Sequence, residues 1–147
     1  MTSNLDWTRF HRAFGDDPGV LPDGEVLGSA EHDWHSVFAM LHRSGWRVTT
    51  SDGHSPLPPN GPGLAEFETF AVWPVDGVRV NFFPGLDAVI FDVDLRELVN
   101  QAAVDGIAHV MRKLGTTLRR DVVMRDEGSS GAPVIHYATA TDQFSLG

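Results

Sequence analysis

The sequence predicts a single α+β domain over residues 1–147, with an antiparallel sheet of about six strands covered by a long amphipathic helix and one or two N-terminal helices. Two alternating apolar runs flank Asp76-Gly77, a pattern typical of a tight β-hairpin. Apolar residues then recur every three or four positions over 95–114, which is the period of an amphipathic helix. Because the strands follow one another instead of alternating with helices, an antiparallel sheet is favoured.

The first third of the chain is expected to form two helices. Aromatic residues recur at helical spacing in 4–15, and Asn4 or Asp6 is a suitable N-cap for this segment. A second helix is expected at 29–45, with Ser29 as its N-cap and a glycine at its end. The segment between the two helices is rich in Pro, Gly and Asp and is expected to be a connector. The buried side of the second helix should carry Trp34, Val37, Phe38 and Leu41.

The remaining segments are expected to form strands joined by loops. In the hairpin, the two-residue turn places Val75 opposite Val78. If the register continues without a break, Trp73 lies opposite Val80. Pro74 indicates that this strand lies at a sheet edge or contains a bulge. The other strands are expected at 46–51, 88–93, 117–125 and 133–140.

The segment "VIFDVD", residues 89–94, poses the choice between an enzyme and a binding protein. It resembles the nucleophile loop of the haloacid-dehalogenase-like phosphatases. In that family the first aspartate attacks phosphorus, the second is the acid and base, and Mg²⁺ bridges the first aspartate and the phosphate. The resemblance implies a metal-dependent phosphohydrolase that uses Asp92 and Asp94. The Gly-Thr step that follows in the family is replaced here by Leu95-Arg96.

A structural interpretation of the same segment is favoured. Asp94 and Glu97 have the D-x-x-E spacing of a capping box, in which the aspartate accepts from the amide of Glu97 and the glutamate reaches back. The long helix would then begin at Leu95 and end at Gly115. The capping box leaves the role of Asp92 unexplained.

Composition excludes several classes of protein. The chain contains no cysteine, so disulfides, thiolate zinc sites and cysteine nucleophiles are excluded. Its net charge of −9 disfavours nucleic acid as a partner, because the phosphate backbone is itself negative, and favours basic protein partners. The sequence contains no recognisable signal peptide and no apolar run that could span a bilayer. We therefore expect a cytoplasmic protein without a membrane partner.

In its general features the chain resembles the immunity proteins that neutralise bacterial polymorphic toxins, which are often small acidic α+β domains. The resemblance comes from its 147 residues, its acidity, its 4 Trp and 9 Phe, and its long turn-rich loops. It implies a non-enzymatic bacterial protein that occludes the active site of a cognate, basic toxin domain. In element order the chain is also similar to secretion-chaperone-like folds, although no matching C-terminal helix is predicted. That fold and the phosphohydrolase are the alternatives.

The expected contact surface with a protein partner consists of acidic residues in the first third of the chain and of the Pro-rich loop. Acidic side chains there would substitute for the negative charge of the toxin's substrate, and an aromatic anchor would add affinity. No catalytic residue, bound metal or cofactor is predicted. The candidate residues are Asp16, Asp17, Asp23, Glu25, Glu31, Asp33, His54 and Asn60.

Overall fold

The computed structural model of the protein describes residues 5–14, 21–57, 69–84, 86–127 and 131–146. Within these residues the chain forms one antiparallel sheet of eight strands and three α-helices, so the predicted α+β class is confirmed. The helices are α1 (Trp7–Phe14), α2 (Trp34–Arg43) and α3 (Gln101–Leu118). The strands are β1 (Asp23–Val26), β2 (Arg47–Thr50), β3 (Phe70–Val75), β4 (Val78–Phe82), β5 (Ile90–Val93), β6 (Val122–Arg125), β7 (Ile135–Ala138) and β8 (Gln143–Leu146). Their order across the sheet is β2-β3-β4-β5-β1-β6-β7-β8.

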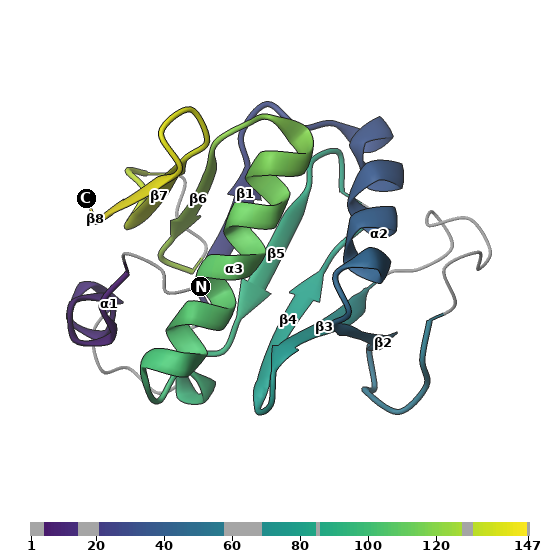
Figure 1. The fold of residues 1–147 in the computed structure, drawn as a ribbon, viewed down its shortest axis with the longest axis horizontal. Helices are drawn as coiled ribbons and strands as arrows, with labels where there is room; N and C mark the ends of the chain where they lie inside the picture. Colours follow the sequence, from purple (N-terminus) through teal and green to yellow (C-terminus); the bar gives the residue numbers. More distant parts are fainter. Residues whose placement is uncertain (1–4, 15–20, 58–68, 85, 128–130, 147) are drawn as a thin grey trace.

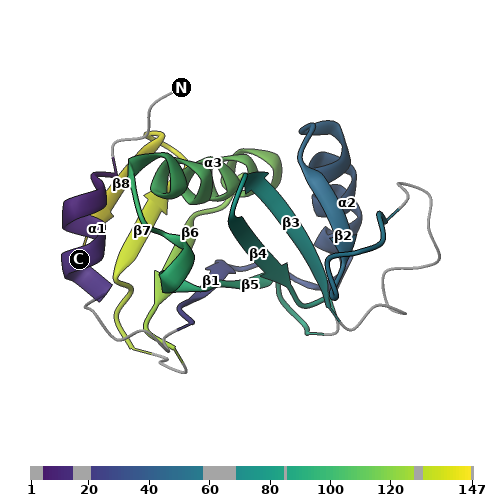
Figure 2. The same cartoon turned by 90° about the horizontal axis from the view of Figure 1, so that it is seen from below.

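The sheet curves around α3, which lies along its concave side (Figure 2). Helix α2 lies beside α3 next to β2 and β3, and α1 lies at the other end next to β8 (Figure 1). The convex side of the sheet carries no helix of the described chain. We call the side toward α3 the covered face and the convex side the open face.

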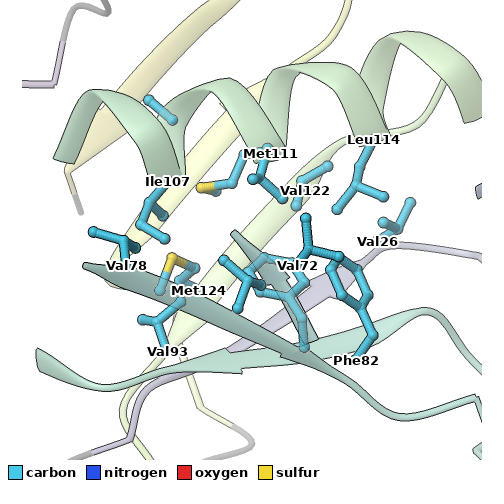
Figure 3. Close-up of a cluster of buried hydrophobic side chains, with 14 of the residues drawn as sticks. Val26, Val72, Val78, Phe82, Val93, Ile107, Met111, Leu114, Val122 and Met124 are labelled. Carbon is cyan, nitrogen blue, oxygen red and sulfur yellow. The ribbon is translucent and has the colours of Figure 1, made fainter. Parts of the chain in front are cut away.

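The hydrophobic core lies between α3 and the covered face (Figure 3). Ile107, Met111 and Leu114 project from α3 onto the sheet, and all three are fully buried. Helix α2 extends the core, because Trp34 packs edge-on against Phe82, with ring centroids 6.2 Å apart. Each such side chain contributes about 1.5–3 kcal/mol through burial. The sheet residues beneath α3 include Val26, Val72, Val78, Phe82, Val93, Val122 and Met124.

The sheet has two more strands than the sequence predicts. The segment expected to be a connector contains β1, which pairs with both β5 and β6 near the middle of the sheet. Its sequence, Asp-Gly-Glu-Val, is poor in strand-forming residues. Gly24 is required because the ring of Phe91 lies over it, and a Cβ there would be 2.0 Å from Phe91 Cζ. The second missed strand, β8, covers Gln143–Leu146 beside β7.

The hairpin β3–β4 is present, but its predicted register is wrong beyond the turn. Val75 pairs with Val78 as expected, and the register then shifts between Val75 and Val72, at a bulge that includes Pro74. Val72 therefore lies opposite Val80, the position that the unbroken register assigns to Trp73. The shift places the apolar residues Phe70, Val72, Val80 and Phe82 together in the core.

The predicted capping box at 94–97 is wrong. Asp94 accepts a hydrogen bond from the amide of Arg96, at 2.9 Å, and caps only a short 3₁₀ turn, Leu95–Glu97. Glu97 does not reach back to Asp94; its Oε1 accepts from the amide of Arg79 on β4, at 2.9 Å. The long helix α3 begins later, at Gln101.

Asn100 is the N-cap of α3, and its side chain accepts from the amide of Ala103 at 2.9 Å. At the other end the helix continues past Gly115 to Leu118, and Arg119 ends it in the left-handed conformation. Gly115 is inside the helix because Tyr137 packs against it, and a Cβ at this position would lie 2.6 Å from the ring.

The two N-terminal helices are shorter than predicted. In α1, Asp6 accepts from the amide of Arg9 at 2.9 Å and is the cap. Ser29 is not the cap of α2; its hydroxyl accepts from the amide of Val89 at 2.9 Å and so ties the end of β1 to the chain before β5. A 3₁₀ turn, Glu31–Asp33, leads into α2 instead. The predicted apolar stripe of α2, Trp34, Val37, Phe38 and Leu41, is buried.

Candidate functional site

A row of side chains, polar except for one alanine, crosses the middle of the open face. Side chains alternate between the two faces of each strand, so Gly24 and Val26 of β1 face the core while Asp23 and Glu25 face outward. The residues paired with Asp23 across the sheet, strand by strand in both directions, form a row that crosses six neighbouring strands. The members of this row, from β2 to β6, are Thr49, Ala71, Asn81, Asp92, Asp23 and Arg125.

Asp92 lies at the centre of the row, directly opposite Asp23. Burial raises the pKa of the Asp92 carboxyl above its usual 3.8, and the negative charges of Asp23 and Glu127 raise it further. A hydrogen bond from Asn81 Nδ2 to Asp92 Oδ1, 2.8 Å long, acts in the opposite direction. Within the described residues Asp92 forms no ion pair. Its half-buried carboxylate lies next to the carboxylate of Asp23 on the neighbouring strand β1.

Beside Asp23, an ion pair joins the next strand to β1. Arg125 on β6 donates to Oε1 of Glu25 at 2.9 Å, and its Nε donates to the carbonyl of Gly131 at 3.1 Å. Both side chains of the pair are partly buried, with 21% of Arg125 and 34% of Glu25 exposed. The charge of Arg125 is therefore held by Glu25.

A depression of about 390 Å³ opens over these carboxylates. Its polar part comes from β1, β5 and β6, and its apolar part from Ile90 and from the segment between β4 and β5. Leu86, in that segment, is one of two large apolar residues with strong exposure in the described chain, at 46%. The depression is lined by Asp23, Gly24, Glu25, Phe83, Leu86, Ile90, Asp92 and Arg125.

On the other side of Asp92, hydrogen bonds fix the orientation of Asn81. Arg79 Nε donates to Asn81 Oδ1 at 2.7 Å, so the amide group of Asn81 must present its nitrogen to Asp92. The guanidinium of Arg79 also donates to the carbonyl of Ser51 and lies 5.8 Å from the ring centroid of Trp73. These contacts hold the floor of the site in one arrangement.

Asp94, the second aspartate of the phosphatase-like segment, has different partners. Arg96 donates Nε to Asp94 Oδ1 at 3.0 Å and Nη2 to Asp94 Oδ2 at 2.6 Å. These hydrogen bonds to Arg96 hold the pKa of Asp94 below its usual range. Asp92 bonds to Asn81 instead, so the two carboxylates are engaged by separate groups. In the described ranges, no three His, Asp or Glu side chains are grouped to hold a metal ion.

The structure brings together only part of the predicted contact surface. Asp23 and Glu25 lie side by side on the open face, next to Asp92. Glu31 and Asp33 lie in the 3₁₀ turn before α2, and Asp33 Oδ2 accepts from the amide of Ala30 at 2.9 Å. His54 is exposed in the loop after β2, where its amide donates to Asp52 at 2.8 Å. Asp16, Asp17 and Asn60 lie outside the described residues.

The sequence prediction missed the residues that complete the site. Ile90, Leu86 and Arg125 reach the same depression as Asp23 only because β1 lies between β5 and β6. The alternation of β4 does place Arg79 and Asn81 on the face away from the core, which was the available signal. Asp92 was assigned a role only in the phosphohydrolase alternative, and the favoured capping interpretation left it unexplained.

Comparison of the chain with protein-family models, with curated proteins and with solved structures found no significant match. None of the helices in the described part of the chain combines the length and the apolar character that a bilayer crossing requires.

Proposed function

We propose that the protein is a non-enzymatic binding protein that holds a basic protein partner on its open face. The partner would be a toxin whose active cleft the protein occludes, as the resemblance to immunity proteins implies. The observation that carries the proposal is the pair of carboxylates, Asp92 and Asp23, in the floor of a depression on the face that no helix of the described residues covers. These carboxylates would attract a positively charged group of a partner.

The cost of the pair supports a functional role. Like charges directly opposite each other on neighbouring strands destabilise a sheet by roughly 0.2–1 kcal/mol. Burial and the charge of Asp23 raise the pKa of Asp92, so the fold disfavours the ionised form of this carboxyl. Titratable groups whose pKa is shifted by burial and by a neighbouring charge are candidates for functional sites. Asn81 and Arg79 hold Asp92 in one position. Because the side chain is already ordered, less conformational entropy is lost when a partner binds.

Long-range electrostatics favours the same kind of partner. The net charge of −9 attracts a basic surface from a distance and accelerates the encounter. A toxin that cleaves or binds a polyanion would present such a surface at its active cleft. Occlusion then needs only steric cover and neutralisation by the acidic side chains, and no bond is made or broken.

The alternatives raised by the sequence have less support. A phosphohydrolase needs Asp92 and Asp94 at one phosphoryl group, whereas Arg96 occupies both oxygens of Asp94. A secretion-chaperone-like fold would end in a helix, whereas the described chain after α3 forms β6, β7 and β8.

Isolation of the partner tests the proposal. The tagged protein is purified from its own cells, the retained protein is identified, and that protein is then expressed alone and together with this chain. We expect growth arrest that the wild-type chain relieves and the double variant Asp23→Asn, Asp92→Asn does not. Asp76→Asn is the control, because it removes one charge at an exposed turn and replaces Asp-Gly by Asn-Gly, which favours the same type of hairpin turn. A retained protein whose activity is unchanged by the wild-type chain would refute the toxin assignment.

A further inference from the structure

We propose that His42 is a pH-sensitive latch between helix α2 and the segment Ser55–Leu57. The protonated ring of His42 holds this segment over the edge of the sheet, and the neutral ring holds it more weakly. The inference goes beyond the proposed function and does not depend on it, because no residue of the open-face depression takes part.

Both ring nitrogens of His42 face backbone carbonyl oxygens. Nδ1 lies 3.0 Å from the carbonyl oxygen of Phe38, and Nε2 lies 2.8 Å from that of Leu57. A carbonyl oxygen only accepts hydrogen bonds, so each contact needs an N–H on the ring. The neutral imidazole carries one N–H whichever tautomer it adopts, whereas the imidazolium carries two. Only the protonated ring therefore satisfies both contacts.

The position of His42 on α2 suits a cation. The residue lies in the last turn of the helix, where the unpaired carbonyl groups create a partial negative charge. Its half-buried ring also packs against the ring of Phe38, with centroids 4.4 Å apart. The ring therefore cannot turn to find other partners without losing this contact.

Loss of the proton weakens the contact with Leu57 in either neutral tautomer. If Nε2 loses its hydrogen, the carbonyl of Leu57 loses its donor. If Nδ1 loses its hydrogen, a lone pair faces the carbonyl oxygen of Phe38 at 3.0 Å, and turning the ring to relieve this repulsion moves Nε2 away from Leu57. Protons therefore favour attachment of the segment. The attachment weakens as the pH rises through the range in which histidine loses its charge, about pH 5 to 8.

The segment that His42 holds covers the outer edge of the sheet. Strand β2 lies at the end of the sheet, with β3 on one side. On its other side the amide of Leu57 donates to the carbonyl of Val48 at 3.0 Å, and the amide of Thr50 donates to the carbonyl of Ser55 at 2.8 Å. An uncovered edge strand presents N–H and C=O groups with which another strand can pair. The charge state of His42 thus controls how firmly this edge is covered.

The other charged groups around the ring do not replace its proton. Within the described residues His42 forms no ion pair. Asp52 accepts from the hydroxyl of Thr50 and from the amide of His54. Glu31 and Asp33 lie in the turn at the opposite end of α2, and on α3 His109 packs against Trp46. The remaining titratable groups on α2, on β2 and in the loop before Ser55 are His35, Arg43, Arg47 and His54.

NMR of the full-length protein tests the latch. Long-range ¹H–¹⁵N spectra distinguish the protonated ring from the two neutral tautomers for each of the seven histidines. The protection factor of the Leu57 amide against hydrogen exchange measures how firmly the segment is attached, and that of the Ile107 amide, inside α3, reports global unfolding. His42→Gln removes the titrating group. His35→Gln, at an exposed histidine of the same helix, is the matched control.

The protection factor of Leu57 should fall about tenfold between about pH 5 and pH 8, as expected for the loss of a hydrogen bond from a charged group. The protection factor of Ile107 should change less over the same range. His42→Gln should abolish the pH dependence at Leu57, and His35→Gln should retain it. In the wild-type protein both ring nitrogens of His42 should carry hydrogen at the lower pH.

Four results would overturn the inference. The first is a Leu57 protection factor that stays constant with pH, and the second is a fall that persists in His42→Gln. The third is an equal fall at Ile107, which would assign the effect to the stability of the whole fold. The fourth is a ring of His42 that carries a single N–H throughout the range.

Discussion

Asp92 on β5 and Asp23 on β1 are direct partners in an antiparallel strand pair, and the burial alternation of both strands places their side chains on the open face of the sheet. Burial and the charge of Asp23 raise the pKa of Asp92 above 3.8. A raised pKa in the folded protein means that the contribution of this carboxyl to stability is present below the unfolded value and is lost as the pH rises through the folded value. At neutral pH the ionised Asp92 therefore lowers the stability of the fold.

Ionised Asp94, in contrast, increases the stability of the fold at neutral pH. Its pKa is lowered, chiefly by the hydrogen bonds from Arg96, so its contribution is present above pH 3.8 and is lost as the pH falls through the folded value. We expect Asp94→Ala to reduce the free energy of unfolding by about 1 kcal/mol at pH 7, because the cap of the 3₁₀ turn is lost. Urea denaturation measures the change.

Magnesium ions provide the matching control for Asp94. We expect them to leave the melting temperature of the wild-type protein unchanged. If Mg²⁺ raised the melting temperature, and if Asp92→Asn and Asp94→Asn each abolished that effect, the phosphohydrolase alternative would replace the binding protein.

The close approach of Phe91 to Gly24 gives a second prediction. Gly24→Ala places a methyl group 2.0 Å from Phe91 Cζ, and the ring cannot retreat freely because Phe82 lies 5.7 Å from it, centroid to centroid. The substitution should cost about 1–3 kcal/mol of stability through overpacking. Chemical denaturation of Gly24→Ala, Phe91→Leu and the double variant measures the coupling between the two sites. Strictly additive effects would show that Phe91 is not the reason for the glycine.

The start of α3 gives a third prediction. Asn100→Ala removes the side chain that accepts from the amide of Ala103 and should cost about 1 kcal/mol. Asn100→Asp keeps an acceptor in the same position and should cost little. Thermal unfolding followed by circular dichroism compares the two variants. Equal stability of Asn100→Ala and the wild-type protein would place the beginning of the helix elsewhere.

Local patterns in the sequence predicted several elements because those elements depend on neighbours along the chain. The turn at Asp76-Gly77 and the period of α3 are of this kind. The register of β3 could not be obtained in the same way, because a bulge between Val72 and Val75 lets the aromatic residues reach the core. Pro74 indicated a bulge, but the alternation on each side of it fits two registers.

The candidate site was less predictable because it depends on long-range pairing. Asp23 and Glu25 were expected in the contact surface from their charge alone, and Asp92 was not expected there. Asp23, Glu25 and Asp92 lie together only because β1 lies between β5 and β6. The Asp-Gly-Glu sequence of β1 disfavours a strand. Phe91 packs over Gly24 and accounts for the glycine in this strand, and no local pattern contains this contact.

The most direct test of the central claim is the free energy of unfolding of Asp92→Asn, measured with urea at pH 7 and again near pH 4. If the fold retains the carboxylate pair at a cost, the variant should be more stable than the wild-type protein by roughly 0.2–1 kcal/mol at pH 7. The difference should shrink at the lower pH, where Asp92 takes up a proton in the wild-type protein. A variant that is less stable than the wild-type protein at pH 7 would contradict the claim, because Asp92 would then be a structural residue.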